Sequence, residues 1–227
     1  MILKGFSLLF LGLGVFVLMQ VVMPVLAFKV WEVKNYDQSQ LLVDPKPRVL
    51  SGKFAPADAR LPDGQVLGVS IEDVNNFPAF IGTGSGADLP YKEFKLTISK
   101  LKLYDTQVLV SSNNFETSLA QLPGTSLPGQ KGNVFITGHS SILSKLSGKQ
   151  IAFFATLPNI KKGDEVIATA LGQKYTYEVM GMKVVDPKDV SVINPPDEEG
   201  RYLTLMTCVP PGFNTKRLVV LTRLKQT

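Results

Sequence analysis

The chain has 227 residues, with 24 Lys and Arg against 19 Asp and Glu, and it contains a single Cys and a single His. One Cys excludes an intramolecular disulfide and any multi-cysteine zinc or iron–sulfur site, and one His excludes a clustered-histidine metal centre. The acidic residues leave a carboxylate-bound calcium ion open, and no other cofactor is expected. Nucleophilic chemistry built on Cys and His can use only Cys208 and His139.

The chain opens with an apolar segment, residues 5–27, that holds 23 positions without a charge. A helix of this length spans roughly 34 Å, enough for a hydrocarbon core of about 30 Å. The alternative is a cleaved signal peptide, since Val25-Leu26-Ala27 is a tolerable cleavage sequence, but the run is longer than a usual signal core. We expect residues 1–27 to be a single-pass anchor in the cell membrane. Both interpretations place the remainder outside the cytoplasm.

The next stretch, residues 28–92, is rich in turn-forming residues and has no sustained period of 2 or 3.6. This pattern predicts a linker that can contain short ordered pieces such as Val66–Ile71.

Residues 93–227 predict a mainly β domain. Turn signals such as Pro123-Gly124 separate short apolar or alternating runs at intervals typical of a barrel or sandwich. Only 114–122 and 151–157 suggest helical turns. This part carries 16 basic and 11 acidic side chains, a mildly basic surface without the clustered stripe of a nucleic-acid binder. The expected strands are Phe94–Ile98, Thr106–Val110, Val134–Thr137, Glu165–Ala170, Lys174–Val185, Tyr202–Cys208 and Leu218–Leu224.

Cys208 closes one of these alternating runs, and a loop containing Pro-Pro-Gly leads from it to the last strand. If the two strands pair antiparallel as neighbours, the end of the first faces the start of the second, so Cys208 and Arg217 meet at one rim. Arg223 shares a face with Arg217 but lies roughly 20 Å further along the strand. The geometry therefore selects Arg217.

His139 also follows a strand, and these three residue types can act together. A nearby imidazole or guanidinium favours the thiolate of Cys208, and an imidazolium can protonate a leaving amine. Arg217 stays charged and can hold a carbonyl oxygen as it becomes negative. The alternative is a strand-end His, a packed Cys and a surface Arg with no relation among them, and spacing alone leaves it open.

Three segments in this order carry recognisable motifs. In LTLMTC the pattern T-L-x-T-C is formed by Thr204, Leu205, Thr207 and Cys208, and it is followed by VPPGFNTKRLVV. In LPGQKGNVFITGHSS the pattern P-G-x-x-G-N-x-x-x-x-G-H is formed by Pro128, Gly129, Gly132, Asn133, Gly138 and His139. Over residues 93–225 the chain resembles the sortases, membrane-anchored cysteine transpeptidases of bacterial surfaces, and the Cys-to-Arg segment is similar to that of class C.

The resemblance implies a closed β-barrel of about eight strands with short helices, formed by residues 93–227 and preceded by the membrane helix and linker. It implies that His139, Cys208 and Arg217 are catalytic and that Thr207 helps to position substrate. The implied reaction cleaves an LPXTG-like sorting motif of a secreted protein at the Thr–Gly bond through a thioester on Cys208. An amine of the cell wall or of a pilin subunit then takes the acyl group, with hydrolysis as a side reaction.

The chain departs from class C in two respects. Asp44-Pro45 is followed by Lys46 instead of the aromatic residue of a lid motif, and the sequence ends at Thr227 without a second membrane helix. Pilus polymerisation and simple anchoring of proteins therefore both stay open. The short acidic run Asp197-Glu198-Glu199 predicts a solvated turn and not a calcium site.

Two other functions stay as alternatives. An L,D-transpeptidase carries S-H-G-C-x-R, with Arg two residues after Cys, whereas position 210 here is Pro. A non-enzymatic, membrane-tethered β-domain, such as a degenerate sortase, would bind an envelope partner, although all three catalytic positions are occupied.

Overall fold

The computed structural model describes residues 2–34, 69–74, 77–82, 89–114, 117–140, 152–211 and 215–225. These residues belong to two compact units, Met1–Asp37 and Gln38–Thr227. The expected features at Asp44-Pro45 and Val66 lie outside the described residues.

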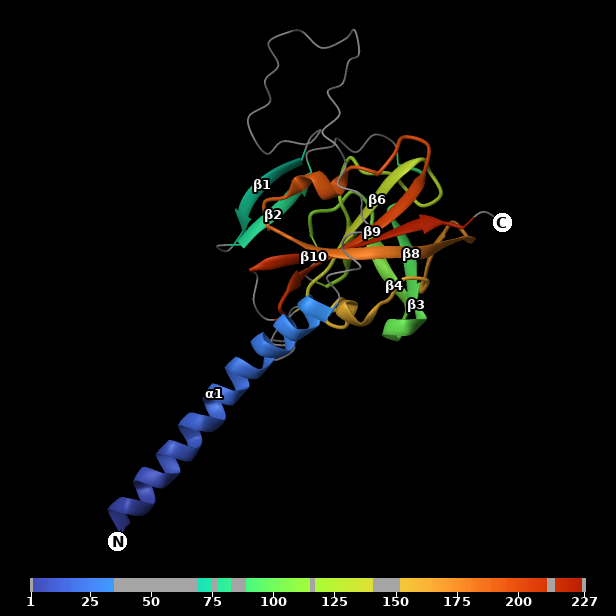
Figure 1. Ribbon diagram of the computed structural model, residues 1–227. Coiled ribbons are helices and arrows are strands. Elements are labelled where there is room, and N and C mark those ends of the chain that lie inside the picture. The colour runs from blue at the N-terminus through green and yellow to red at the C-terminus, as the bar shows by residue number, and fades with distance from the viewer. Residues whose placement is uncertain are drawn as a thin grey trace. The chain divides into compact units, whose positions relative to one another are not determined.

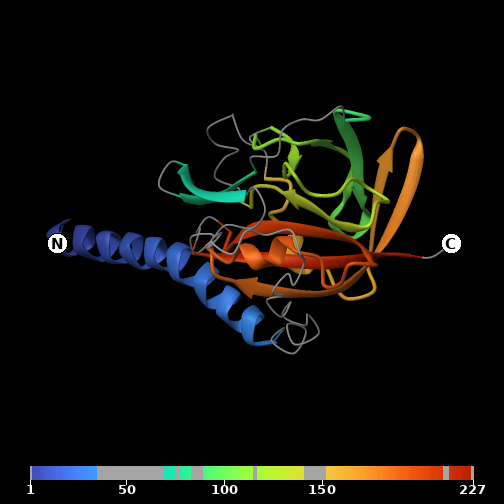
Figure 2. The same ribbon diagram turned by 90° about the horizontal axis from the view of Figure 1, so that it is seen from above.

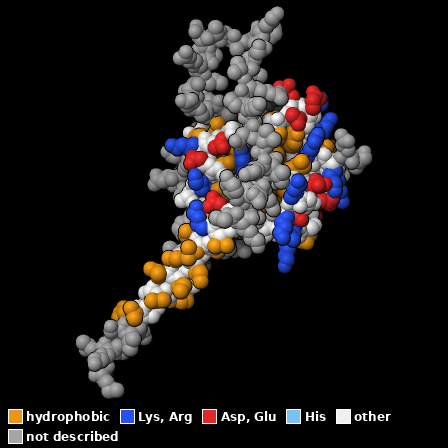
Figure 3. Space-filling model, viewed as in Figure 1, with side chains coloured by type: hydrophobic (Ala, Val, Ile, Leu, Met, Phe, Trp, Pro, Cys, Tyr) orange, Lys and Arg blue, Asp and Glu red, His pale blue; other side chains and the backbone are white. Residues whose placement is uncertain are grey.

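The first unit contains one long helix, α1 (Ile2–Lys34). Its segment Phe10–Glu32 is 23 residues long with a mean hydropathy of 2.3, so it could cross a membrane by length and composition. Hydrophobic side chains cover its described surface (Figure 3). The helix continues past Ala27, the expected end of the anchor, and an ion pair of 2.8 Å joins Lys29 to Glu32 in this extension.

The second unit is built on a closed barrel of eight strands, and this confirms the predicted fold class (Figures 1 and 2). The order around the barrel is β10-β8-β7-β3-β4-β5-β6-β9. The β4–β5 and β6–β9 pairs are parallel and all other pairs are antiparallel. The strands are β3 (Glu93–Ile98), β4 (Leu103–Leu109), β5 (Leu119–Gln121), β6 (Gly132–Thr137), β7 (Glu165–Ala170), β8 (Gln173–Val185), β9 (Arg201–Val209) and β10 (Lys216–Leu224).

Alternation of side chains along the strands fills the barrel interior. On β9 the inward positions are Leu203 and Leu205, and both are fully buried. Other inward side chains with no exposed surface are Leu96, Val108, Leu119, Ile136, Val166, Leu218 and Val220. Leu119–Gln121, expected within a helical turn, is instead strand β5, because its backbone is paired on both sides by β4 and β6.

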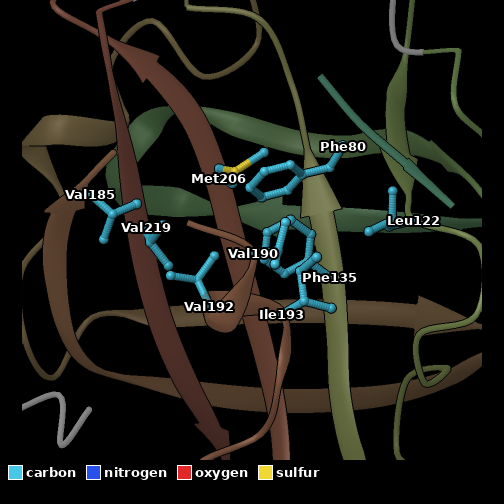
Figure 4. Close-up of a cluster of buried hydrophobic side chains, with 9 residues drawn as sticks. All are labelled: Phe80, Leu122, Phe135, Val185, Val190, Val192, Ile193, Met206 and Val219. Atoms are coloured by element: carbon cyan, nitrogen blue, oxygen red, sulfur yellow. The ribbon is translucent and has the colours of Figure 1, made fainter. Parts of the chain in front are cut away.

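The outer face of β6, β9 and β10 is also covered, by two elements outside the barrel. One is a hairpin of β1 (Val69–Val74) and β2 (Phe77–Gly82), which lies in the stretch expected to be a linker. The other is the short helix η4 (Val190–Ile193) between β8 and β9. Together they form an outer cluster of Phe80, Leu122, Phe135, Val185, Val190, Val192, Ile193, Met206 and Val219 (Figure 4).

Polar contacts and close packing attach the hairpin to the barrel. The Asn113 side chain accepts from the Gly82 N–H and donates to the Gly82 carbonyl, both at 3.1 Å. A Cβ on Gly82 would lie 2.6 Å from the Pro123 carbonyl oxygen, so the close approach requires glycine. Two further short helices, η1 (Ser99–Leu101) and η3 (Leu157–Asn159), complete the described elements.

Candidate functional site

Cys208 and Arg217 lie directly opposite each other on neighbouring strands. β9 and β10 pair antiparallel, and the register aligns Cys208 with Arg217. Side chains of such pairs share a face, with Cβ atoms about 4.5–5.5 Å apart. This confirms the strand pairing predicted from the Pro-Pro-Gly loop.

His139 comes to the same rim from the other side of β9. β6 and β9 pair in parallel with Thr137 opposite Met206, and the Gly138 N–H donates to the Met206 carbonyl at 3.2 Å. His139 lies two residues past the end of β6, and continuing the register places it level with Cys208. The His139 carbonyl accepts from the Phe154 N–H at 3.0 Å, which fixes the backbone beyond the strand. The structure therefore brings together His139, Cys208 and Arg217.

Thr207 lies on the opposite side of β9 from Cys208. Its side chain is 1% exposed, and its hydroxyl donates to the Gly138 carbonyl at 2.7 Å. This hydrogen bond joins the residue before Cys208 to the residue before His139. Thr207 therefore contacts the backbone directly before His139.

The surroundings of Cys208 determine how easily its thiol ionises. Burial raises the pKa of the Cys208 thiol above its ordinary value, and the positive charge of Arg217 opposes part of that rise. Arg217 is itself 4% exposed, and its guanidinium donates to the Lys216 carbonyl at 3.2 Å. A buried, permanently charged group thus lies beside a thiol that is mainly protonated at neutral pH, so a base is needed to form the thiolate.

Arg223 occupies a different environment at the far end of β10. The register pairs it with Tyr202, and its guanidinium carbon lies 5.9 Å from the centre of the Tyr202 ring. Tyr202 also donates its hydroxyl to Asp197. Asp197, in the acidic run expected to be a solvated turn, also accepts from the Glu199 N–H at 3.0 Å. In the described part of the chain, no group of three or more His, Cys, Asp and Glu could hold a metal ion.

Two other motif residues, Asn133 and Thr204, form a buried polar link beneath η4. The Thr204 hydroxyl donates to the Asn133 side chain at 2.9 Å, and the Asn133 amide donates to the Ile193 carbonyl at 2.9 Å. Both side chains are at most 4% exposed. No role was assigned to Asn133 and Thr204 from the sequence. A polar residue within an apolar strand run was the feature that could have indicated a buried hydrogen bond. They attach η4 to the strands that carry His139 and Cys208.

The sequence of this chain is similar to those of one known protein family. A family model described as the sortase domain matches residues 95–225. Sortase A of Listeria monocytogenes is 33% identical over 97 residues, which cover 43% of this chain and 40% of the relative. Sortase A of Bacillus anthracis is 32% identical over 90 residues, covering 40% of this chain and 39% of the relative. The chain therefore matches about two fifths of the length of these relatives.

Solved structures agree with the barrel. Sortase A from Corynebacterium diphtheriae has a TM-score of 0.53 at 27% identity, over 63% of this chain and 64% of the other. The pilus-related sortase C of Group B Streptococcus has a TM-score of 0.52 at 28% identity, over 61% and 70%. Since the family model covers more than half of the 227 residues and the folds agree, the chain belongs to the sortase family, a family of transpeptidases.

Proposed function

We propose that this protein is a membrane-anchored cysteine transpeptidase that cleaves an LPXTG-like sorting motif and transfers the acyl part to an amine of the cell envelope or of a pilin. The observation that carries the proposal is the alignment of Cys208 with Arg217 across β9 and β10, with His139 two residues past the end of β6 beside β9. This arrangement provides a nucleophile, a base and an oxyanion donor at one rim.

The first half of the reaction forms the acyl-enzyme. His139 takes the proton of the Cys208 thiol, and the sulfur attacks the carbonyl carbon of the scissile peptide bond. The carbonyl oxygen becomes negative beside the Arg217 guanidinium, which stays charged throughout. The carbon–nitrogen bond then breaks, the imidazolium of His139 protonates the leaving amine, and a thioester remains on Cys208.

The second half returns the enzyme to its starting state. An incoming amine attacks the thioester carbonyl, its extra proton passes to His139, and the carbon–sulfur bond breaks. The proton then returns from His139 to Cys208, and the product carries a new amide bond. Water in place of the amine gives hydrolysis.

The membrane anchor is α1. Its 23-residue apolar segment meets the length and composition of a single span, and no charged residue occurs between Gly5 and Ala27. The proposed location is the cell membrane, with the barrel outside the cytoplasm. Secreted proteins with a C-terminal sorting motif are the proposed partners. The relative described as pilus-related supports a pilin among the acceptors.

The test uses the full chain in detergent micelles with a panel of LPXTG-like peptides and several amines, with products identified by mass. We expect a thioester adduct on Cys208 and an amide product that depends on the added amine. Cys208→Ala should give neither, and the matched control Arg223→Ala should give both. If no peptide in the panel acylates Cys208, the proposal fails in favour of a degenerate sortase that only binds.

A further inference from the structure

A fourth polar residue, Ser118, lies in line with the three candidate catalytic residues. β5 and β6 pair antiparallel with Ala120 opposite Thr137. Continuing this register by two residues aligns Ser118 with His139. The intermediate step is supported by packing, because a Cβ built on Gly138 would lie 2.4 Å from a methyl carbon of Leu119.

All four side chains share one face of the sheet. Strands β5, β6, β9 and β10 are consecutive in the barrel. Ser118 directly precedes β5, His139 lies two residues past the end of β6, and Cys208 and Arg217 are on β9 and β10. Neighbouring strands are about 4.8 Å apart. In this row the backbone register places Cys208 on one side of His139 and Ser118 on the other.

Ser118 is also an unusual buried residue. Its side chain is 3% exposed, and its Oγ has no hydrogen-bond partner among the described residues. A buried hydroxyl without a partner costs free energy, and such groups in native proteins usually have a partner or a function. A serine hydroxyl can rotate and accept a hydrogen bond. Ser118 is therefore suited to a partner that presents an N–H donor during the reaction.

We propose that Ser118 is a positioning residue whose Oγ accepts the N–H of the His139 ring nitrogen that faces away from Cys208. This rests on the proposed function, in which the other ring nitrogen exchanges a proton with the Cys208 thiol. When that proton arrives, the ring becomes an imidazolium with two N–H donors, and Ser118 stabilises the second. Along the row, the titratable and charged groups of the described residues are His139, Cys208 on β9 and Arg217 on β10.

The chain offers a clean measurement of this contact because it contains a single His. The full chain, labelled at histidine and held in detergent micelles, gives one imidazole signal whose titration midpoint is followed by NMR. Ser118→Ala removes the acceptor of the charged form, so the midpoint should move to lower pH. The matched control Ser126→Ala removes a hydroxyl that donates to Lys131 near the start of β6, and it should leave the midpoint unchanged.

Kinetics provide the second readout. A hydrogen bond to a charged group contributes about 1.5–3 kcal/mol, so Ser118→Ala should lower kcat by about 10- to 100-fold. KM should stay within about twofold, and Ser118→Thr, which keeps the hydroxyl, should restore most of kcat. An unchanged midpoint in Ser118→Ala overturns the proposal, and a raised KM with that unchanged midpoint would assign Ser118 to substrate instead. A parent chain without transpeptidation would refute the proposed function, while the midpoint would still decide the Ser118–His139 contact.

Discussion

Thr207 allows a sharp test of how the strand of Cys208 positions His139. Thr207→Val keeps the side-chain shape but removes the hydroxyl that donates to the Gly138 carbonyl at 2.7 Å. Since Thr207 is 1% exposed, water cannot readily replace the lost donor. Leaving a buried acceptor without this donor costs about 1–3 kcal/mol of unfolding free energy. For a domain of this size, that corresponds to a fall in Tm of about 2–12 °C.

The effect on the reaction should exceed the effect on stability. Gly138 precedes His139 directly, and a displacement of about 1 Å in a catalytic group can cost about 100-fold in rate. We expect Thr207→Val to lower kcat by about 10- to 100-fold with little change in KM. Thr207→Ser keeps the donor and should stay within a few-fold of the parent.

Thr222 provides a matched control. Its hydroxyl donates to the Leu203 carbonyl at 2.8 Å from another fully buried, inward position, far from the rim. Thr222→Val should therefore lose similar stability while keeping kcat. The assay measures Tm by circular dichroism together with kcat and KM for peptide transfer. The reasoning is refuted if both valine variants lose kcat equally, or if Thr207→Val raises KM with kcat intact, which would indicate a substrate contact instead.

Three further predictions concern neighbouring residues. Arg217→Ala should lower kcat by at least about 10²–10³-fold with an unchanged circular dichroism spectrum, and Arg217→Lys should stay impaired. Arg223→Ala should keep kcat within a few-fold of the parent. A larger loss of kcat in Arg223→Ala than in Arg217→Ala would contradict the assigned register. Burial raises the pKa of the Cys208 thiol and Arg217 opposes the rise, so the rate of alkylation by iodoacetamide should have a pH midpoint above that of an ordinary thiol. Arg217→Ala should raise this pH midpoint further. A pH midpoint below the ordinary value would indicate a stable thiolate and contradict the prediction. Asn133→Ala removes the hydrogen bond to the Ile193 carbonyl of η4 and the one accepted from the Thr204 hydroxyl, so it should cost about 2–3 kcal/mol in denaturant unfolding. The exposed control Asn159→Ala should stay within about 0.5 kcal/mol, and equal losses would remove the special role of Asn133.

Local pattern was sufficient for most of the barrel. β7 was expected at Glu165–Ala170 and occupies the same residues, because side chains alternate between buried and half-exposed positions and turn signals bound both ends. The pairing of Cys208 with Arg217 was also accessible, since a short loop joins their strands and neighbouring antiparallel strands must meet at the loop. His139 was marked by its place after an apolar run.

Other features required the closed barrel. β5 has only three residues, all buried, so it shows no alternation, and its strand character comes from pairing with β4 and β6. The hairpin of β1 and β2 lies in a turn-rich stretch, and its order is supported by the packing of Phe80 and Ile71 in the outer cluster.

In the candidate site, too, some features follow from the sequence and others require the closed barrel. The chemistry of Cys208, His139 and Arg217 is a property of residue type, so the sequence alone named these three residues as candidates. The alignment of Ser118 with His139 depends on β5 lying beside β6, and the contact of Thr207 with Gly138 depends on β6 lying beside β9. A periodic pattern determines which face a side chain occupies, but only barrel closure decides which distant strand supplies its neighbour.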